Sequence, residues 1–302
     1  MAQHADWIAA DWGTSNLRLW ALDAAGAVIA QRSSPKGMGG LAPEDFEPAL
    51  LELAGDLLAP GRATRVVACG MAGARQGWIE APYRAVPCTP AGPGAVHPPS
   101  RDPRLDVAIL PGLSQANPPD VMRGEETQIA GFLEQTPGFD GTLCLPGTHS
   151  KWVTLAGGKV RGFRTAMTGE IFAFLAGQSV LRHAMAEGWD EAAFLAALDE
   201  TLARPEALAT SLFGIRAQAL LAGGDGAAAR SRLSGLLIWQ ELAATRPFWQ
   251  HRPVTVIGAP KLSAAYVAAL THLGAKATPA DGTGLVRAGL AAAHTQLKDQ
   301  SA

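Results

Sequence analysis

A short strand, a Gly-Thr turn and a second short strand follow one another twice in the chain, and this repeat constrains the fold more than any other feature. Each copy begins with apolar residues that stop at the small residues of the turn, which predicts a β-hairpin. A pattern that occurs twice indicates two related lobes and not a solenoid. We therefore expect a functional site in a cleft between the lobes. The expected strands are residues 7–11, 17–22, 142–145 and 151–155, with turns at Gly13-Thr14 and Gly147-Thr148.

The first half continues with a strand, a helix and a further strand. Apolar runs at residues 27–32 and 65–69 flank a stretch with helical spacing at 43–59, which predicts the order β-β-β-α-β. Prolines recur from residue 87 to residue 119, and they break any long element. We expect a loop there around one short strand, residues 107–110.

The second half repeats the beginning of this order and then becomes helical. Residues 160–167 complete a second set of three strands, and residues 168–244 are rich in Ala and Leu at helical spacing, with a break at Gly223-Gly224. The final part of the chain predicts a strand and two helices. These elements are residues 254–258, 263–273 and 285–297.

Composition excludes several classes of function. The chain has 302 residues, of which 48% are hydrophobic, and its formal net charge of -2 provides no basic footprint for nucleic acid. Its 3 cysteines have no metal-ligand spacing and favour a reduced, cytoplasmic protein. The N-terminal residues do not resemble a signal peptide, and no apolar run is long enough to span a membrane. The apolar composition would permit a homodimer.

The motifs of several common enzyme classes are absent from the sequence. It contains no P-loop motif, no G-x-G-x-x-G, no H-E-x-x-H and no G-x-S-x-G. What remains is Asp11 at the end of a strand, followed by Gly13, Thr14 and Ser15, whose backbone N–H groups could approach an anion. Alone, such a segment is more often a simple turn. Two Gly-Thr hairpins, however, can clamp the phosphates of a nucleotide from opposite sides.

The sequence resembles the sugar kinase, Hsp70 and actin superfamily, in which two phosphate loops and an adenosine loop occur in this order. More narrowly, it is similar to the 2-dehydro-3-deoxygalactonokinase family, over nearly the whole chain. The segments that carry this resemblance are WIAADWGTSNLRLW, CGMAGARQGW, MRGEETQ, LPGTHSKW, MTGE and SRLSGLL. The resemblance implies an α/β fold of two ribonuclease-H-like lobes, the actin-like ATPase fold, with a central cleft. We expect an N-terminal lobe at residues 1–128 and a C-terminal lobe at 129–302, with the last helix packing back across the lobes.

The resemblance also implies ATP-dependent phosphorylation of the 6-hydroxyl of 2-keto-3-deoxygalactonate, with Mg²⁺ as the metal. Asp11 suits the Mg²⁺ through water, because Mg²⁺ keeps several waters and takes few carboxylates. The phosphate oxygens are assigned to the two turns: Gly13, Thr14 and Ser15 in the first, and Gly147, Thr148 and His149 in the second. Many superfamily members carry an aspartate in the second loop, where Leu145 or Pro146 stands here. Lys151 or His149 could supply compensating charge.

The catalytic base is expected in the segment Gly124 to Gln128, which opens a predicted helix. Glu126 is our first choice and Glu125 the second, because the spacing of Glu126 to Gln128 and Ala130 resembles the acid-x-Gln-x-Ala pattern of related kinases. The alternative is that these acids only stabilise the helix N-terminus.

The acceptor is expected to bind beside the loop that follows residues 65–69. Arg75 could hold its carboxylate through two parallel N–H···O bonds. The alternative is a solvated Arg75 and a Trp78 that belongs to the core. The other acceptor candidates are Gln76, Trp78, Lys36, Gly39, Lys151 and Arg18, and the adenosine loop is expected at Gly258 to Ser263.

Two other classes of protein remain as alternatives to this kinase. One comprises enzymes on the same scaffold with a different substrate, namely a kinase for another 2-keto-3-deoxy sugar acid or a polyphosphate or nucleotide-polyphosphate hydrolase. The other is a non-catalytic nucleotide-dependent sensor or filament protein, against which the acids Glu125 and Glu126 argue.

Overall fold

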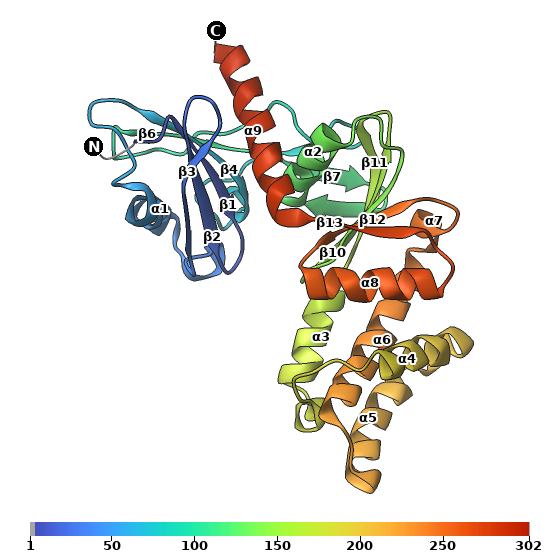
Figure 1. Cartoon of the computed structure of the whole chain (residues 1–302). Helices are drawn as coiled ribbons and strands as arrows, with labels where there is room; N and C mark the ends of the chain where they lie inside the picture. The colour runs from blue at the N-terminus through green and yellow to red at the C-terminus, as the bar shows by residue number, and fades with distance from the viewer. Residues whose placement is uncertain (1–3, 302) are drawn as a thin grey trace. The chain divides into compact units, whose positions relative to one another are not determined.

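The computed structural model describes residues 4–301, and the chain divides into two units (Figure 1). Unit 1 contains the chain up to Asp140, the segment Leu155–Gly162 and the chain from Gly282 onward. Unit 2 contains Gly141–Thr154 and Phe163–Asp281. The expected lobe boundary between residues 128 and 129 falls inside helix α2 (Glu125–Gln135), which belongs to unit 1.

The first sheet has the strand order β3-β2-β1-β4-β6. β1 pairs antiparallel with β2, and β2 with β3, because short turns connect them, whereas β4 and β6 run parallel to β1 and need longer connections. The first two predicted strands and the fourth are confirmed within one residue. The five strands are Trp7–Trp12, Leu17–Leu22, Val28–Ser34, Thr64–Gly70 and Leu105–Ile109.

The helix expected at residues 43–59 is shorter than predicted. A 3-10 turn, Pro43–Asp45, precedes α1 (Phe46–Ala54), and the helix ends at Gly55. Its buried positions Phe46, Ala49, Leu50 and Ala54 recur at helical spacing and pack against the sheet core. Gly55, followed five residues later by Pro60, explains why the apolar spacing beyond residue 54 does not extend the helix.

The second sheet repeats the order of the first, as β11-β10-β9-β12-β13. The expected twofold repeat is therefore confirmed, and β12 has the predicted bounds. β13 was not predicted; it lies at the sheet edge, where Pro279 is tolerated. The strands are Lys159–Ala166, Ser150–Ala156, Gly141–Leu145, Val254–Gly258 and Ala277–Asp281.

The strand expected at residues 107–110 is confirmed as β6, but the proline-rich segment around it is more ordered than expected, because it also contains β7 and the start of β8. A third, small sheet has the order β5-β7-β8. Its prolines stand at strand ends and in turns, so they limit the strands to three to five residues without preventing them. Its strands are Tyr83–Ala85, Gly112–Ala116 and Pro119–Met122, and 3-10 turns occur at Met38–Gly40 and Met71–Gly73.

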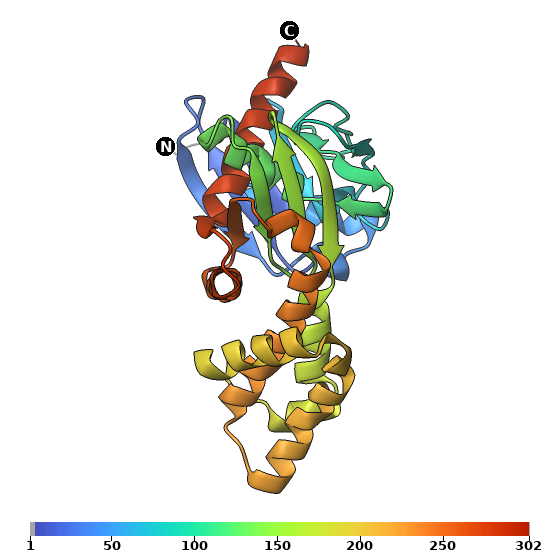
Figure 2. The ribbon, with the colours of Figure 1, turned by 90° about the vertical axis from the view of Figure 1, so that its right-hand side faces the viewer.

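The helical stretch of unit 2 and its predicted break at Gly223-Gly224 are confirmed. Figure 2 shows these helices grouped at one end of the unit. No helix among residues 4–301 is long and apolar enough to cross a membrane. The helices are α3 Thr168–Gly177, α4 Glu191–Ala203, α5 Leu208–Ala222, α6 Gly226–Ala244, α7 Arg246–Trp249 and α8 Pro260–His272, with 3-10 turns at Val180–Ala184 and Pro205–Ala207.

The last helix, α9 (Gly282–Ser301), packs against α2 within unit 1 (Figure 1). Two glycines permit the close crossing: a Cβ atom at Gly131 would overlap the carbonyl oxygen of Leu285, and one at Gly289 would overlap that of Thr127. Any other residue at these positions would force the helices apart. The position of α2 therefore depends on α9.

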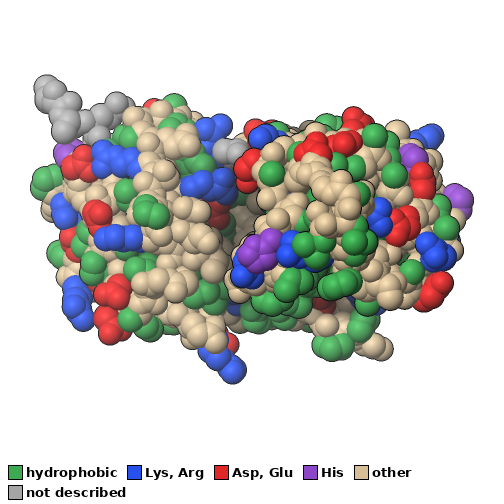
Figure 3. Space-filling model, turned by 90° about the horizontal axis from the view of Figure 1, so that it is seen from below, with side chains coloured by type: hydrophobic (Ala, Val, Ile, Leu, Met, Phe, Trp, Pro, Cys, Tyr) green, Lys and Arg blue, Asp and Glu red, His purple; other side chains and the backbone are tan. Residues whose placement is uncertain are grey.

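Charged side chains of both signs are interspersed on the face of the molecule in Figure 3. That face has no large area of one sign. This distribution agrees with the near-neutral net charge of the chain.

Candidate active site

Three predicted segments of unit 1 meet at the ends of β1 and β4. A Cβ atom at Gly70, which has φ +85°, would lie 2.5 Å from the carbonyl oxygen of Trp12. A Cβ atom at Gly124, which has φ +102°, would lie 3.4 Å from the Cα of Gly70. Glycine at both positions thus brings the strand end with Asp11 close to the helix start with Glu126.

Asp11 is mostly buried, with 15% of its side chain exposed. Arg18 Nε donates a hydrogen bond of 3.0 Å to Asp11 Oδ2, and the Arg18 Nη2 donates to the same oxygen. The other oxygen, Oδ1, accepts a contact of 3.7 Å from Cys69 Sγ. Burial raises the pKa of the Cys69 thiol, and the charges of Asp11 and Glu126 raise it further.

This environment fits a water-bound magnesium ion. Within residues 4–301, no group of three or more His, Cys, Asp or Glu side chains is arranged to hold a metal. Mg²⁺ in phosphoryl-transfer sites needs only one or two carboxylates, with waters and phosphates completing its shell. Among the residues that the structure describes, only the weak sulfur donor of Cys69 contacts Asp11 Oδ1, so this oxygen can accept hydrogen bonds from metal-bound water.

The segment that contains Lys36 and Gly39 packs against the first turn and is hydrogen-bonded to its backbone. Gly13 N donates to Asn16 O at 2.8 Å, and Gly39 N donates to Thr14 O at 2.9 Å. The side chains of Thr14 and Ser15 remain exposed. The ammonium of Lys36 is paired with Glu52, so this segment shapes the turn through its backbone.

The two glutamates have different surroundings. Glu126 is 2% exposed; its Oε2 accepts from Gly124 N at 2.7 Å and its Oε1 from Thr127 Oγ1 at 3.1 Å. Burial, with the charge of Glu125, raises the pKa of Glu126 to about 8. Glu125 is only half-buried and accepts from Arg123 N at 3.1 Å.

The loop after β4 contains the expected acceptor residues. Arg75 is 80% exposed and lies 3.6 Å from a carboxylate oxygen of Glu80, and Gln76 is exposed too. Trp78 instead packs against the core, with its ring 6.1 Å from that of Phe46 and 6.2 Å from that of Trp12. Arg75 and Gln76 are therefore available to a ligand, whereas Trp78 is largely a packing residue.

Sequence reasoning missed Arg123, although it stands in the MRGEETQ segment. Its Nη2 donates to Ala81 O at 2.7 Å, and its guanidinium lies 4.3 Å from the ring centroid of Tyr83. Its Nε and Nη1 are buried and have no hydrogen-bond partner among residues 4–301. Such unsatisfied buried donors are consistent with an anion site.

The second turn, in unit 2, is fastened to the start of α3. Glu170 N donates to Thr148 O at 3.0 Å, and a Cβ atom at Gly169 would overlap the carbonyl oxygen of Gly147. His149 Nε2 lies 2.6 Å from Glu170 Oε2. Gly147, Thr148 and His149 remain accessible. Lys151 is buried in β10, which separates it from the exposed turn.

A pocket of about 790 Å³ in unit 2 begins at this turn. It contains basic residues that the sequence did not reveal, Arg230 of α6 and Lys261 of α8, together with Ser234 of the SRLSGLL segment. Gly258 and Ser263, expected at the adenosine loop, line a second hollow of about 890 Å³ along α8. Glu191 lines both hollows. The second adds Asp281 and has no Lys or Arg in its lining, whereas the first has Arg230 and Lys261 beside Glu187 and Glu191, so the first pocket is better suited to an anionic nucleotide.

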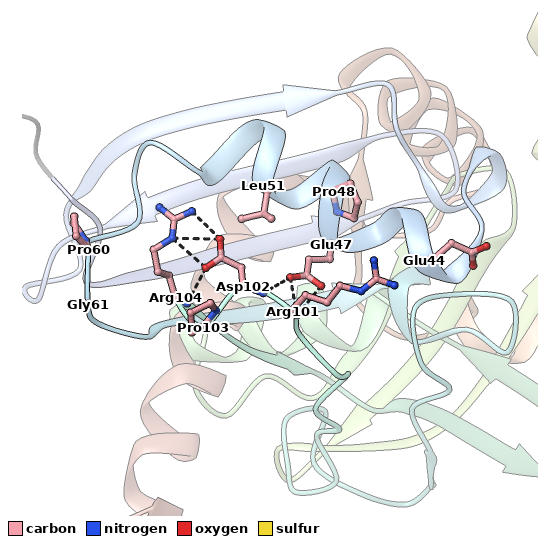
Figure 4. A pocket seen from close by; sticks show the side chains of 10 residues that line it. All are labelled: Glu44, Glu47, Pro48, Leu51, Pro60, Gly61, Arg101, Asp102, Pro103 and Arg104. Atoms are coloured by element: carbon pink, nitrogen blue, oxygen red, sulfur yellow. Dashed lines mark hydrogen bonds and ion pairs between the residues drawn. The ribbon is translucent and has the colours of Figure 1, made fainter.

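A third pocket, of about 670 Å³ in unit 1, contains none of the motif residues (Figure 4). Two of its carboxylates are already engaged: Glu47 accepts from Ser100 Oγ, Arg101 N and Asp102 N at 2.7 to 3.1 Å, and Asp102 pairs with Arg104. These contacts fasten the loop before β6 to α1. They account for the buried carboxylate without a ligand.

The model of the 2-keto-3-deoxy-galactonokinase family matches residues 11–293. The chain belongs to this family. A protein of Rhizobium meliloti named "Probable 2-dehydro-3-deoxygalactonokinase" is 42% identical to this chain. The alignment covers 94% of this chain and 95% of that protein. The 2-dehydro-3-deoxygalactonokinase of Escherichia coli is 33% identical, covering 95% of this chain and 96% of that protein.

Solved structures agree with this family and with its fold. The crystal structure of a Sinorhizobium meliloti protein described as a 2-dehydro-3-deoxygalactonokinase is similar to the structure of this chain, with a TM-score of 0.87 and 40% sequence identity. The comparison covers 96% of each chain. The activator of 2-hydroxyisocaproyl-CoA dehydratase from Clostridium difficile, with bound ADPNP, has a TM-score of 0.53 and 12% identity, covering 98% of this chain and 97% of that one. The second likeness concerns the fold alone. This family member therefore has the actin-like α/β fold of two ribonuclease-H-like halves that was expected.

Proposed function

We propose that this 2-keto-3-deoxy-galactonokinase family member phosphorylates 2-dehydro-3-deoxygalactonate in galactonate breakdown. The 6-hydroxyl oxygen bonds to the γ-phosphorus of ATP, the bond from that phosphorus to the β–γ bridging oxygen breaks, the hydroxyl proton passes to a protein base, and ADP leaves. The observation that carries the proposal is the family match over residues 11–293.

We assign the nucleoside of ATP to the 790 Å³ pocket of unit 2, whose volume is typical of small-molecule sites, about 300–1,000 Å³. Arg230 and Lys261 supply positive charge there beside the carboxylates of Glu187 and Glu191, and Gly147 and Thr148 line one end. The phosphate oxygens are assigned to Gly147, Thr148 and His149, and in unit 1 to Gly13, Thr14 and Ser15.

Asp11 would hold Mg²⁺ through water, and the bound ion would neutralise charge on the transferring phosphoryl group. The pairing of Arg18 with Asp11 supports a role for Arg18 in orienting this carboxylate rather than in binding the sugar acid.

Glu126 is assigned as the base. A group with a pKa of about 8 accepts a proton efficiently near neutral pH, and Glu126 has that value. Glu125 is the second candidate because it is more exposed.

The test is ADP formation with ATP and a panel of sugar acids, each with and without Mg²⁺. We expect turnover that requires both Mg²⁺ and 2-dehydro-3-deoxygalactonate. Equal ATP hydrolysis with and without any sugar acid would contradict a kinase and favour a hydrolase. Faster turnover with another keto-deoxy acid would show that this other acid is the substrate.

Arg75 is assigned to the carboxylate of the sugar acid, since its exposed guanidinium can form a two-bonded fork. Replacing Arg75 by lysine should raise the KM for the sugar acid roughly 10-fold or more and leave the KM for ATP nearly unchanged, because a point charge lacks the fork. Steady-state kinetics with both substrates varied provide the measurement.

Arg123→Lys is the comparison for Arg75→Lys. In the described chain, two guanidinium nitrogens of Arg123 are buried without a hydrogen-bond partner, so Arg123 is the other cation that could hold the carboxylate. If Arg75→Lys leaves the sugar-acid KM unaltered and Arg123→Lys raises it, Arg123 holds the carboxylate.

A further inference from the structure

A buried cluster of polar side chains lies directly beside the proposed nucleotide pocket. Some of its members belong to the segments LPGTHSKW and MTGE, but the proposed reaction gives none of them a role. We define the Glu241 cluster as the carboxylate of Glu241 with its four neighbours. The neighbours are Ser150, Trp152, Thr168 and Tyr266.

The hydrogen bonds of the cluster converge on the carboxylate. Trp152 Nε1 donates to Glu241 Oε1 at 2.7 Å, and the Tyr266 hydroxyl donates to Oε2 at 2.8 Å. Thr168 is also hydrogen-bonded to Glu241, and Ser150 Oγ lies 3.0 Å from the Tyr266 hydroxyl. Glu241 is 4% exposed. Burial raises the pKa of Glu241, and the donated hydrogen bonds oppose that rise.

The cluster joins the elements that enclose the pocket. Ser150 and Trp152 lie on β10, Thr168 is the first residue of α3, Glu241 lies on α6 and Tyr266 on α8. The same turn and helices line the 790 Å³ pocket through Gly147 and Thr148, Thr168 and Gly169, Ser234 and Lys261. One buried acceptor thus connects the pocket walls to each other.

The connection to the phosphate turn is short. Thr168 is hydrogen-bonded to Glu241. Gly169, which follows Thr168, packs on the carbonyl group of Gly147, and the N–H of Glu170 donates a hydrogen bond to Thr148 O. A shift of α3 would therefore move the turn to which the phosphates are assigned. An apolar core could stabilise the same helices without burying a carboxyl group, so Glu241 is the group to test for a role beyond stability.

We propose that Glu241 is a positioning residue for ATP: through Thr168 and the start of α3 it fixes the Gly147-Thr148 turn in the geometry that binds the phosphates. This inference rests on the proposed ATP site. Its effect should appear in nucleotide affinity, whereas a purely structural role would appear only in stability.

The test uses the full chain with Glu241 replaced by glutamine, which keeps the shape but turns an amide N–H₂ toward donors. We expect the Kd for a non-hydrolysable ATP analogue, measured by calorimetry, to rise roughly tenfold or more, the size that losing a hydrogen bond to a charged group can produce. The sugar-acid Kd measured without nucleotide should change less than about twofold.

Glu47→Gln provides the matched control, since Glu47 is also a buried carboxylate with three donors, at the start of α1 in unit 1. It should lower Tm to a similar degree and leave the analogue Kd unchanged. If Tm falls by the same amount in both variants and the Kd for the ATP analogue changes in neither, Glu241 has only a structural role and the inference is wrong.

Trp152→Phe keeps the inference testable if Glu241→Gln does not fold, because it removes one donor from Glu241 and lies outside the pocket lining. It should raise the analogue Kd by about two- to fivefold, and an unchanged Kd would overturn the inference. A wild-type chain that binds no ATP analogue would contradict the proposed function itself, so the two failures are distinguishable.

Discussion

Replacing Asp11 by asparagine should lower turnover at least about 100-fold while the protein stays folded. The asparagine side chain can still accept a hydrogen bond from Arg18, so the end of β1 keeps its local partner. What is lost is the negative charge that would hold Mg²⁺ where charge develops during phosphoryl transfer. The measurement is kcat across a Mg²⁺ titration, with Tm recorded to show that the fold is intact.

Asp23→Asn is the control for this variant. Asp23 also belongs to a hairpin turn, where its Oδ1 accepts from Ala25 N at 2.9 Å and Ala27 N at 2.8 Å, but it is not part of the proposed site. It should keep normal turnover. If Asp11→Asn behaves in the same way, Asp11 serves only as a turn residue.

Replacing Glu126 by glutamine should lower turnover by roughly 10²–10⁴ and leave nucleotide binding nearly unchanged, because the general base is lost. In the wild-type protein kcat should rise with pH through about 8, since only the ionised carboxylate accepts a proton and the pKa of Glu126 is raised to about 8. The variant should lack this rise. Glu125→Gln is the matched comparison, and a larger loss there would reverse the two roles.

Stability offers an independent check on Glu126. Its pKa is about 8 in the folded protein against 4.5 for an ordinary glutamate, so the folded state holds this proton more tightly than the unfolded state. The resulting stabilisation is complete below 4.5 and is lost as the pH rises toward 8. Tm of Glu126→Gln should therefore increase relative to that of the wild type between these pH values.

The sequence was sufficient to predict elements whose cause is local. The hairpins around Gly13 and Gly147 follow from small turn residues between apolar runs, and their repetition led directly to two sheets of the same order. β5, β7 and β8 were missed because proline counts against strands, although short strands accommodate it at their ends.

The candidate site was less predictable, because its geometry comes from contacts between distant segments. Nothing local to Glu126 indicates that it is buried while Glu125 is not; that difference depends on how α2 packs. Likewise, Arg230 and Lys261 stand far apart in the sequence, and only the folding of α6 beside α8 places both in one pocket. The partners of Arg18 and Lys36 also required the structure, since either cation could equally have faced a ligand.

The crossing of α2 and α9 has a consequence for biosynthesis. A ribosome completes α2 early, but its partner helix is made only after the whole of unit 2, because residues 282–301 follow Asp281 in the chain. Until those residues have emerged, Gly131 and Thr127 have no helix packed on them, and the glutamate pair at the start of α2 lacks its final support. A growing chain that already contains both phosphate turns is thus still unfinished at its acidic pair. Synthesis order alone thus delays the assembly of this proposed phosphoryl-transfer site until α9 has been made.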